Sequence, residues 1–337
     1  MKNVKKYLRN VIIFLSILIL TYYIVFKDQD GTEIFGLLKT VDIKYVMIAI
    51  LCMFVYEVCE AINLGRGLKA LNEKSSLLSN IKYVLIGSFF SGITPAASGG
   101  QPMQIYYMHK DDIAVANSTL ALLMNLTCTQ IATISIGITS AVINFQYMNK
   151  TLFGFFLLGI FLNGSALTLL LLAIFSMNAF NKITNFAMKI LKWLKIPNID
   201  KLEEKIEREV DIYNSSSKYL KKHKRMIVQM LIITFVQYFA FYSVAYWIYR
   251  SFGLNNENIF RVTSIQAMLY ATVSGIPSPG AVGVSEGGYI EIFKNIIPDN
   301  MLKSVMILTR AINFYFLLIV GMFVTMYNSF KEKKAIK

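Results

Sequence analysis

The sequence predicts an all-α, polytopic membrane protein. Of its 337 residues, 55% are hydrophobic and only 16% are charged. The mean hydropathy is +0.51. Soluble domains usually contain about a quarter charged residues, and several apolar runs here approach the roughly 20 residues that cross a bilayer as a helix. We expect one domain over residues 1–337, an inner-membrane helical bundle with six full spans and two re-entrant broken-helix hairpins in an inverted repeat.

The first predicted span covers about residues 11–26 and follows a basic N-terminus. No small-x-small cleavage site follows this apolar run, so we interpret it as an uncleaved span rather than a secretory signal. The basic residues before it place the N-terminus in the cytoplasm. After an outside loop at 27–44, a second span covers about 45–64. It contains Glu57 and Glu60, which lie three positions apart and so on one helix face.

The remaining elements alternate between apolar spans and polar connections. Spans are expected at about 113–143, 152–175, 226–249 and 305–327, and broken segments at 83–108 and 260–293. The connection 177–225 contains twelve basic and six acidic residues. Apolar residues recur in it at helical spacing, as in an amphipathic helix on an anionic leaflet. A connector helix packed on the cytoplasmic face of the bundle explains the same pattern.

Two stretches rich in glycine and proline interrupt the apolar segments, SGITPAASGGQ at 91–101 and SGIPSPGAVGVSEGGY at 274–289. Irregular backbone cannot face lipid, because unpaired N–H and C=O groups cost several kcal/mol each there. If both segments crossed the membrane, the basic loop 177–225 would lie outside. If both are re-entrant, all strongly basic segments and both termini are cytoplasmic, in agreement with the positive-inside rule.

The two stretches align with a single gap, which superposes Pro95 on Pro279 and Gly99 on Gly283. Their first residues, Ser91 and Ser274, lie 183 positions apart. The first hairpin would enter from the cytoplasm and the second from outside. We therefore predict inverted repeats at about 9–143 and 152–329, an arrangement typical of transporters with interrupted helices near the midplane.

Ionisable residues inside spans are costly and suggest function. Glu286 follows the second break and Arg310 lies within the last span, so the two are natural partners for a buried ion pair. Such a pair either pins the hairpin in place or holds a lipid phosphate. Glu57 and Glu60 are secondary candidates, which alternatively line a cytoplasmic vestibule or pair with Arg66.

The glycine-rich breaks predict a second kind of site. A helix that restarts at membrane depth presents free N–H groups and the positive end of its dipole, which together attract anions. The candidate lipid- or anion-binding residues, besides Glu286 and Arg310, are Ser98, Gly99, Gly100, Gln101, Gly280 and Gly283. Tight helix packing is the alternative reason for the glycines.

Enzyme chemistry has little support. The two histidines, His109 and His223, lie far apart among lysines, and neither an HExxH motif, a P-loop nor a nucleophile elbow is present. The three cysteines fall in apolar segments without the spacing of a metal site or disulfide framework. We expect no catalytic residues, no metal, no cofactor and no nucleic-acid partner.

These motifs resemble those of the lysylphosphatidylglycerol synthase transmembrane-region family of flippase-like membrane proteins. TPAASGGQPMQIYYM at 94–108 is similar to its first motif, PSPGAVGVSEGG at 277–288 to its second, and the arginine of ILTRAINFY to one in its last span. Two positions depart from the family pattern, since Gln101 stands where many members have Glu and Ala281 replaces a glycine.

The resemblance implies a protein that moves or accommodates charged lipids, aminoacylated or glycosylated, across the bacterial cytoplasmic membrane. It implies anionic, aminoacylated or glycosylated lipids as partners, alongside a separately encoded lipid-modifying enzyme, and is compatible with an oligomer. The alternative is a phosphatidylglycerol lysyltransferase or its subunit, linked to resistance against cationic antimicrobial peptides. The sequence ends soon after the last span, so we expect no lysyl-tRNA-dependent transferase activity.

Overall fold

The computed structural model describes residues 39–94, 97–176, 224–276 and 283–335, together with residues 36 and 281 and five single positions between 210 and 217. Helices and turns make up these residues, and no strand occurs among them. Five of the described helices are long and apolar enough to cross a membrane. The all-α bundle is therefore confirmed. The predicted span at 11–26 lies outside the described residues, as does nearly all of the loop 177–225, and the count of six spans stays a prediction.

The long helices match the predicted spans closely. They are α3 (Ile43–Ala70), α6 (Val115–Ile143), α7 (Lys150–Phe175), α10 (Lys224–Ser251), and a continuous unit of α13 (Asp299–Arg310), the π-helical η4 (Ala311–Tyr315) and α14 (Phe316–Ala335). This last unit begins at Asp299, six positions before the predicted start at 305. Its first turns contain Asp299, Asn300 and Lys303, whose polarity hides the helix from a search for apolar runs.

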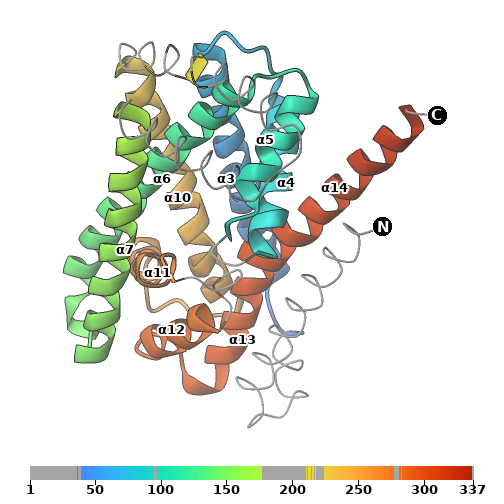
Figure 1. The fold of residues 1–337 in the computed structure, drawn as a ribbon. Coiled ribbons are helices and arrows are strands. Elements are labelled where there is room, and N and C mark those ends of the chain that lie inside the picture. Colours follow the sequence, from blue (N-terminus) through green and yellow to red (C-terminus); the bar gives the residue numbers. More distant parts are fainter. Residues whose placement is uncertain are drawn as a thin grey trace, which may run out of the picture.

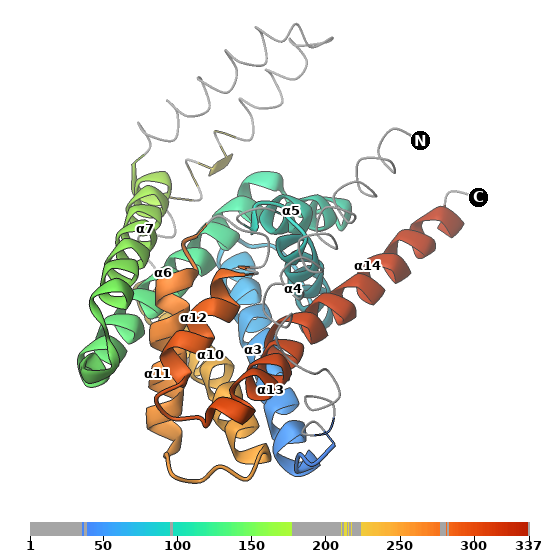
Figure 2. The same ribbon diagram turned by 90° about the horizontal axis from the view of Figure 1, so that it is seen from below.

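The centre of the bundle is an antiparallel pair, α3 and α10 (Figures 1 and 2). The backbone N–H of Asp42, before α3, donates to the carbonyl of Ser251 at the end of α10 over 2.9 Å. Near the other end, Asn63 Nδ2 donates to the Met230 carbonyl over 3.2 Å. These two helices are the second spans of the predicted repeats, and an inverted repeat requires them to run in opposite directions.

Each glycine-rich stretch separates two short helices that fold back on each other. The first break joins α4 (Leu77–Gly92) to α5 (Gly100–Lys110), and the second joins α11 (Ile259–Val273) to α12 (Val284–Phe293). These helices have 16, 11, 15 and 10 residues, and at 1.5 Å per residue each falls short of the ~30 Å hydrocarbon core. The two hairpins occupy opposite ends of the bundle (Figure 1).

The two breaks share an unusual backbone detail. Ala97 and Ala281 both have positive φ, 54° and 52°, in a region that L-residues with a side chain rarely adopt. Each alanine lies two positions before the N-cap glycine of the next helix, Gly99 or Gly283. The alignment that superposes Gly99 on Gly283 also superposes these alanines.

Packing between the halves shows the same correspondence. Helix α11 packs on α6, and α4 packs on α14. A Cβ added at Gly137 of α6 would lie 2.5 Å from Ala271 Cβ, and one added at Gly321 of α14 would lie 2.4 Å from the Leu85 carbonyl oxygen. The two glycines are 184 positions apart. Each hairpin therefore rests on a close glycine contact with the opposite half, as an inverted duplication predicts.

Candidate functional site

A cavity of about 290 Å³ lies where the two breaks meet. The first hairpin contributes Ser91, Gly92 and Ala97 to its wall, and the second contributes Ala281 and Ser285. We call this space the central cavity. Its other lining residues come from α3, α4, α10, α11, the start of the second break (Ser274 and Ile276) and the last helical unit. They are Tyr56, Ser88, Phe241, Gln266, Leu269, Tyr270, Val273, Ser274, Ile276, Arg310, Asn313, Phe314, Leu317 and Leu318.

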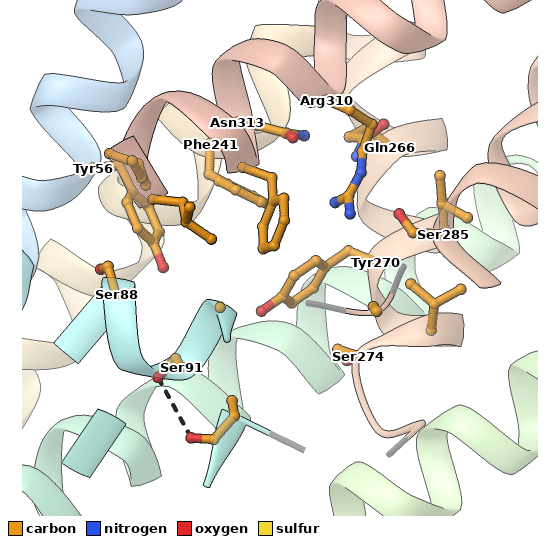
Figure 3. A pocket seen from close by; sticks show the side chains of 18 of the residues that line it. Tyr56, Ser88, Ser91, Phe241, Gln266, Tyr270, Ser274, Ser285, Arg310 and Asn313 are labelled. Atoms are coloured by element: carbon orange, nitrogen blue, oxygen red, sulfur yellow. Dashed lines mark hydrogen bonds between the residues drawn. The ribbon is translucent and has the colours of Figure 1, made fainter. Parts of the chain in front are cut away.

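A buried ion pair joins Arg310, which lines the central cavity, to Glu286. Arg310 Nε lies 2.9 Å from Glu286 Oε1, and the two side chains are only 11% and 7% exposed. The predicted pairing is therefore confirmed as a contact. The Arg310 guanidinium lies over the ring of Phe314, 4.5 Å from its centroid, and points into the cavity toward Tyr270 and Ser285 (Figure 3).

The local backbone places both charges. Arg310 is the last residue of α13, immediately before the π-helical segment Ala311–Tyr315. π-Helical turns are rare and frequently occur at functional sites. Glu286 lies in the first turn of α12, where its Oε2 accepts the Gly283 N–H over 2.7 Å. A carboxylate is stabilised at a helix N-terminus, so the charge of Glu286 is balanced by both the dipole of α12 and Arg310.

The rest of the described cavity wall combines apolar side chains with uncharged polar ones. Serine hydroxyls, tyrosine rings and two side-chain amides, from Gln266 and Asn313, surround the guanidinium. Gln266 Oε1 and Asn313 Oδ1 are buried without a hydrogen-bond partner among the described residues. Sequence reasoning missed both amides. The available signal was a polar residue inside an apolar helix, as in SIQAMLY and RAINFY.

The first break uses its polar groups mainly within the protein. Thr94 Oγ1 accepts the Gly99 N–H over 2.9 Å and donates to the Phe90 carbonyl over 2.6 Å. A Cβ on Gly100 would lie 2.0 Å from Ser91 Oγ, so this glycine serves close packing. Ser98 is exposed and Gln101 partly exposed, and neither is among the described residues that line the central cavity.

Some of the N–H groups predicted to bind an anion at the restarting helices are thus already hydrogen-bonded within the protein. Thr94 accepts the N–H of Gly99 in the first break, and Glu286 accepts that of Gly283 in the second. Gly280 lies outside the described residues. Positive charge facing the cavity comes instead from Arg310.

Glu57 and Glu60 occupy a separate place between α3, α4 and α10. Glu57 is 4% exposed, and its Oε1 accepts the Ser88 hydroxyl over 3.2 Å. Glu60 Oε2 accepts from Gln237 Nε2 over 3.3 Å. The predicted alternative of a pair with Arg66 does not form, because Arg66 Nη1 donates to Gln229 Oε1 over 2.6 Å.

Among the described residues, no group of three His, Cys, Asp or Glu side chains is placed to hold a metal ion. Cys52, Cys59 and Cys128 are free thiols. The chemistry of the described site is therefore that of one guanidinium, one carboxylate, hydroxyls and amides.

The surface outside this site suits lipid. Helix α7 exposes large apolar side chains such as Phe161 and Leu169, which are 69% and 67% exposed. The fold and the site together define a multi-pass α-helical membrane protein in which two broken hairpins meet around a buried ion pair. The chain belongs to the family described as the lysylphosphatidylglycerol synthase TM region, whose profile matches residues 10–321.

Similar proteins come from archaea. A UPF0104 membrane protein of Pyrococcus horikoshii is 25% identical over an alignment 339 residues long, which spans 94% of this chain and 95% of the relative. A UPF0104 membrane protein of Archaeoglobus fulgidus is 20% identical over 320 residues, covering 92% of this chain and 94% of the relative. A third, from Methanothermobacter thermautotrophicus, is 20% identical over 296 residues, with coverage of 86% and 87%.

Proposed function

We propose that the protein moves phospholipids with a charged headgroup between the two leaflets of the membrane. The observation that carries the proposal is the Arg310–Glu286 pair, whose arginine lines a cavity to which both hairpin breaks contribute. An arginine recognises a phosphate through charge-assisted hydrogen bonds. Cavity hydroxyls and amides supply further partners for a glycerol, sugar or aminoacyl group.

The size and position of the central cavity suit a headgroup. Its volume of about 290 Å³ is close to the lower end of ordinary ligand pockets, roughly 300–1,000 Å³. It lies between hairpins from opposite ends of the bundle, so small movements of either break would open it toward one side. Discontinuous helices around a central site are typical of transporters with alternating access.

A second space suits an acyl chain. An apolar groove of about 310 Å³ lies between α7, α11 and α12, and we call it the lateral groove. It shares Val273 and Ile276 with the central cavity. Its remaining lining residues are Asn149, Thr151, Leu152, Phe155, Thr272, Val284, Gly287, Gly288, Glu291 and Ile292. A lipid with its headgroup in the cavity would thus have an apolar path for its tail.

The proposal is tested in proteoliposomes that contain phospholipid with a fluorescent acyl chain, whose outer-leaflet label is quenched chemically. For each lipid, the exchange rate with protein is divided by the rate in protein-free liposomes. We expect this acceleration to be much larger for labelled phosphatidylglycerol than for a labelled diacylglycerol, which lacks the phosphate. Equal acceleration of both lipids, or no acceleration of either, would contradict the proposal.

The alternative, a phosphatidylglycerol lysyltransferase, is not favoured, since the matching family profile is that of the transmembrane region. Formation of lysylphosphatidylglycerol from lysyl-tRNA by the purified chain would reverse this preference. The proposal includes a location in the bacterial cytoplasmic membrane, a cytoplasmic position of both termini and a lipid with a charged headgroup.

The lateral groove gives a separate prediction. Gly287 lines the groove, and a Cβ added there would meet no atom within 4 Å, so the side chain of Gly287→Leu starts in open space beside the groove. We expect this variant to fold normally and to slow phospholipid exchange several-fold, because the leucine occupies space needed by the acyl chain. Gly154→Leu on α7 is the matched control, since it also meets no atom within 4 Å but lies outside the lining of the groove. Equal exchange by both variants would exclude the groove as the acyl-chain site.

A further inference from the structure

A stripe of polar side chains runs along the interface between α3 and α10. On α3 it consists of Glu57, Glu60, Asn63 and Arg66, which recur every three positions. Each is therefore a neighbour of the next, and the row winds gradually around the helix, from Glu57 beside α4 to the three residues that bond to α10. On α10 it consists of Gln229, Thr234 and Gln237. Hydrogen bonds join the two sides at Glu60–Gln237, at 2.9 Å from Asn63 Nδ2 to Thr234 Oγ1, and at Arg66–Gln229. We call these seven residues the polar ladder.

One end of the polar ladder reaches the central cavity. Ser88, whose hydroxyl donates to Glu57, lines the cavity, as does Tyr56, the neighbour of Glu57 in the chain. Figure 3 shows Tyr56 and Ser88 among the side chains that line the cavity. The other end lies near the end of α3, where Lys69 belongs to the last helical turn. The ladder therefore connects the cavity with one end of the bundle.

The carboxylates of the ladder lack compensating charge. Glu57 and Glu60 form no ion pair with any described residue, whereas Glu286 has Arg310. Glu57 is 4% exposed and Glu60 is partly buried. An ionised carboxylate in such surroundings without a cation is costly, and two of them one helical turn apart repel each other. The titratable side chains that face the pair are Tyr56 from α3 and Tyr270 from α11, while α4 offers Ser88 and α10 offers Gln237. All of these are neutral when protonated, so binding a proton is the way to remove the charge.

Unpartnered polar atoms follow the same line. Gln237 is 1% exposed and Asn63 is 0% exposed, yet Gln237 Oε1, Asn63 Oδ1 and Glu57 Oε2 have no hydrogen-bond partner among the described residues. Buried acceptors of this kind are normally satisfied by a proton donor or by ordered water. The two amide oxygens and the free oxygen of Glu57, together with Glu60, mark a route for hydrogen-bonded protons.

We propose that the polar ladder is a proton-binding pathway, in which Glu57 and Glu60 take up protons that drive the movement of lipid through the central cavity. This inference rests on the proposed function for its coupling step and adds the energy source. Glu57 is neutral when it is protonated. When it is ionised, it places a negative charge next to the Ser88 hydroxyl, and Ser88 lines the cavity. An anionic headgroup is repelled by the ionised form, so its residence in the cavity and the protonation of Glu57 favour each other.

The test imposes a pH difference of either sign across proteoliposomes and measures exchange of labelled phosphatidylglycerol. We expect the wild-type rate to change several-fold with the sign of the gradient, and the Glu57→Gln and Glu60→Gln rates not to change with it. Glutamine keeps the acceptor for Ser88 or the partner for Gln237, so both variants are expected to fold. Glu257→Gln is the control, because Glu257 belongs to a surface pair with Arg261 at 3.9 Å and should retain the wild-type response.

The outcomes separate this inference from the proposed function. Wild-type exchange that ignores the pH gradient, or that follows only a sodium gradient, overturns the proton pathway and leaves lipid movement intact. If the wild type moves no lipid, infrared difference spectroscopy still decides the site. A carbonyl band of a protonated carboxylic acid at neutral pH that is lost in Glu57→Gln or Glu60→Gln supports proton binding, and an ionised pair overturns it.

Discussion

Replacing Arg310 with alanine is expected to abolish phospholipid exchange and to destabilise the protein. The substitution leaves Glu286, which is 7% exposed, as a buried carboxylate without its cation. Removing one partner of a buried ion pair typically costs about 3–5 kcal/mol. Loss of the guanidinium also removes charge-assisted hydrogen bonds to a phosphate, worth about 1.5–3 kcal/mol each, or roughly ten- to a hundred-fold in exchange rate. Thermal unfolding in detergent and the exchange assay measure the two effects.

A double variant separates the structural role of the pair from its role in lipid binding. In Arg310→Met with Glu286→Gln, both charges are gone and the glutamine oxygen can still accept the Gly283 N–H, which Glu286 accepts over 2.7 Å. Neutral replacements of a buried pair are often as stable as the pair itself, so we expect the stability to return. Exchange should stay abolished, because none of the described residues that line the cavity then carries the charge that a phosphate requires.

The control is a pair on the surface. Lys294 and Glu291 lie 2.7 Å apart, but their side chains are 46% and 38% exposed. Lys294→Ala should change the stability by less than about 1 kcal/mol. Restored exchange in the double variant would show that the Arg310–Glu286 pair only fixes the hairpin, and would remove the main support for the proposed function.

Much of the bundle follows from simple physical rules. The spans α3, α6, α7 and α10 were predictable because each is a long apolar run, and the breaks because proline and glycine at membrane depth end a helix. The Glu286–Arg310 contact was predictable too, since two ionisable residues in apolar surroundings are far less costly together than apart.

Other features depend on tertiary packing and were not predictable. Positive φ at Ala97 and Ala281 contradicts the preference of alanine, and only the surrounding fold imposes it. Gln266, Asn313 and Gln237 are single polar residues in apolar helices, and the sequence does not say which neighbour each one faces. The polar ladder could not be predicted because its two halves are far apart in the sequence. Asn63 and Thr234, for example, are hydrogen-bonded across a separation of 171 residues, and only the antiparallel packing of α3 and α10 brings them together.

The approach of α7 to α11 gives the second large expected effect. A Cβ on Gly159 would lie 2.4 Å from the carbonyl oxygen of Ala271 and 2.6 Å from that of Thr272. Both carbonyls are backbone atoms in the last turn of α11, just before the second break, so no side chain can yield. Asn163, one turn further along α7, donates to the same Ala271 carbonyl over 3.3 Å and to Ser274 Oγ over 3.2 Å. The start of the break is therefore held by one face of α7.

Gly159→Ala is expected to push α7 away from α11 and to weaken the Asn163 bonds, at a cost of about 1–3 kcal/mol, as for other overpacked contacts. The same helix supplies two controls, because a Cβ on Gly154 or Gly164 meets no atom within 4 Å. Gly154→Ala and Gly164→Ala should leave the stability unchanged or raise it by about 0.5–1 kcal/mol, since alanine favours a helix over glycine. Thermal unfolding of the three variants in one detergent compares them directly. A Gly159→Ala protein as stable as the two controls would mean that α7 does not hold the second break. The position of that break would then have to depend on its other contacts, the Arg310–Glu286 pair and the packing of α11 on α6.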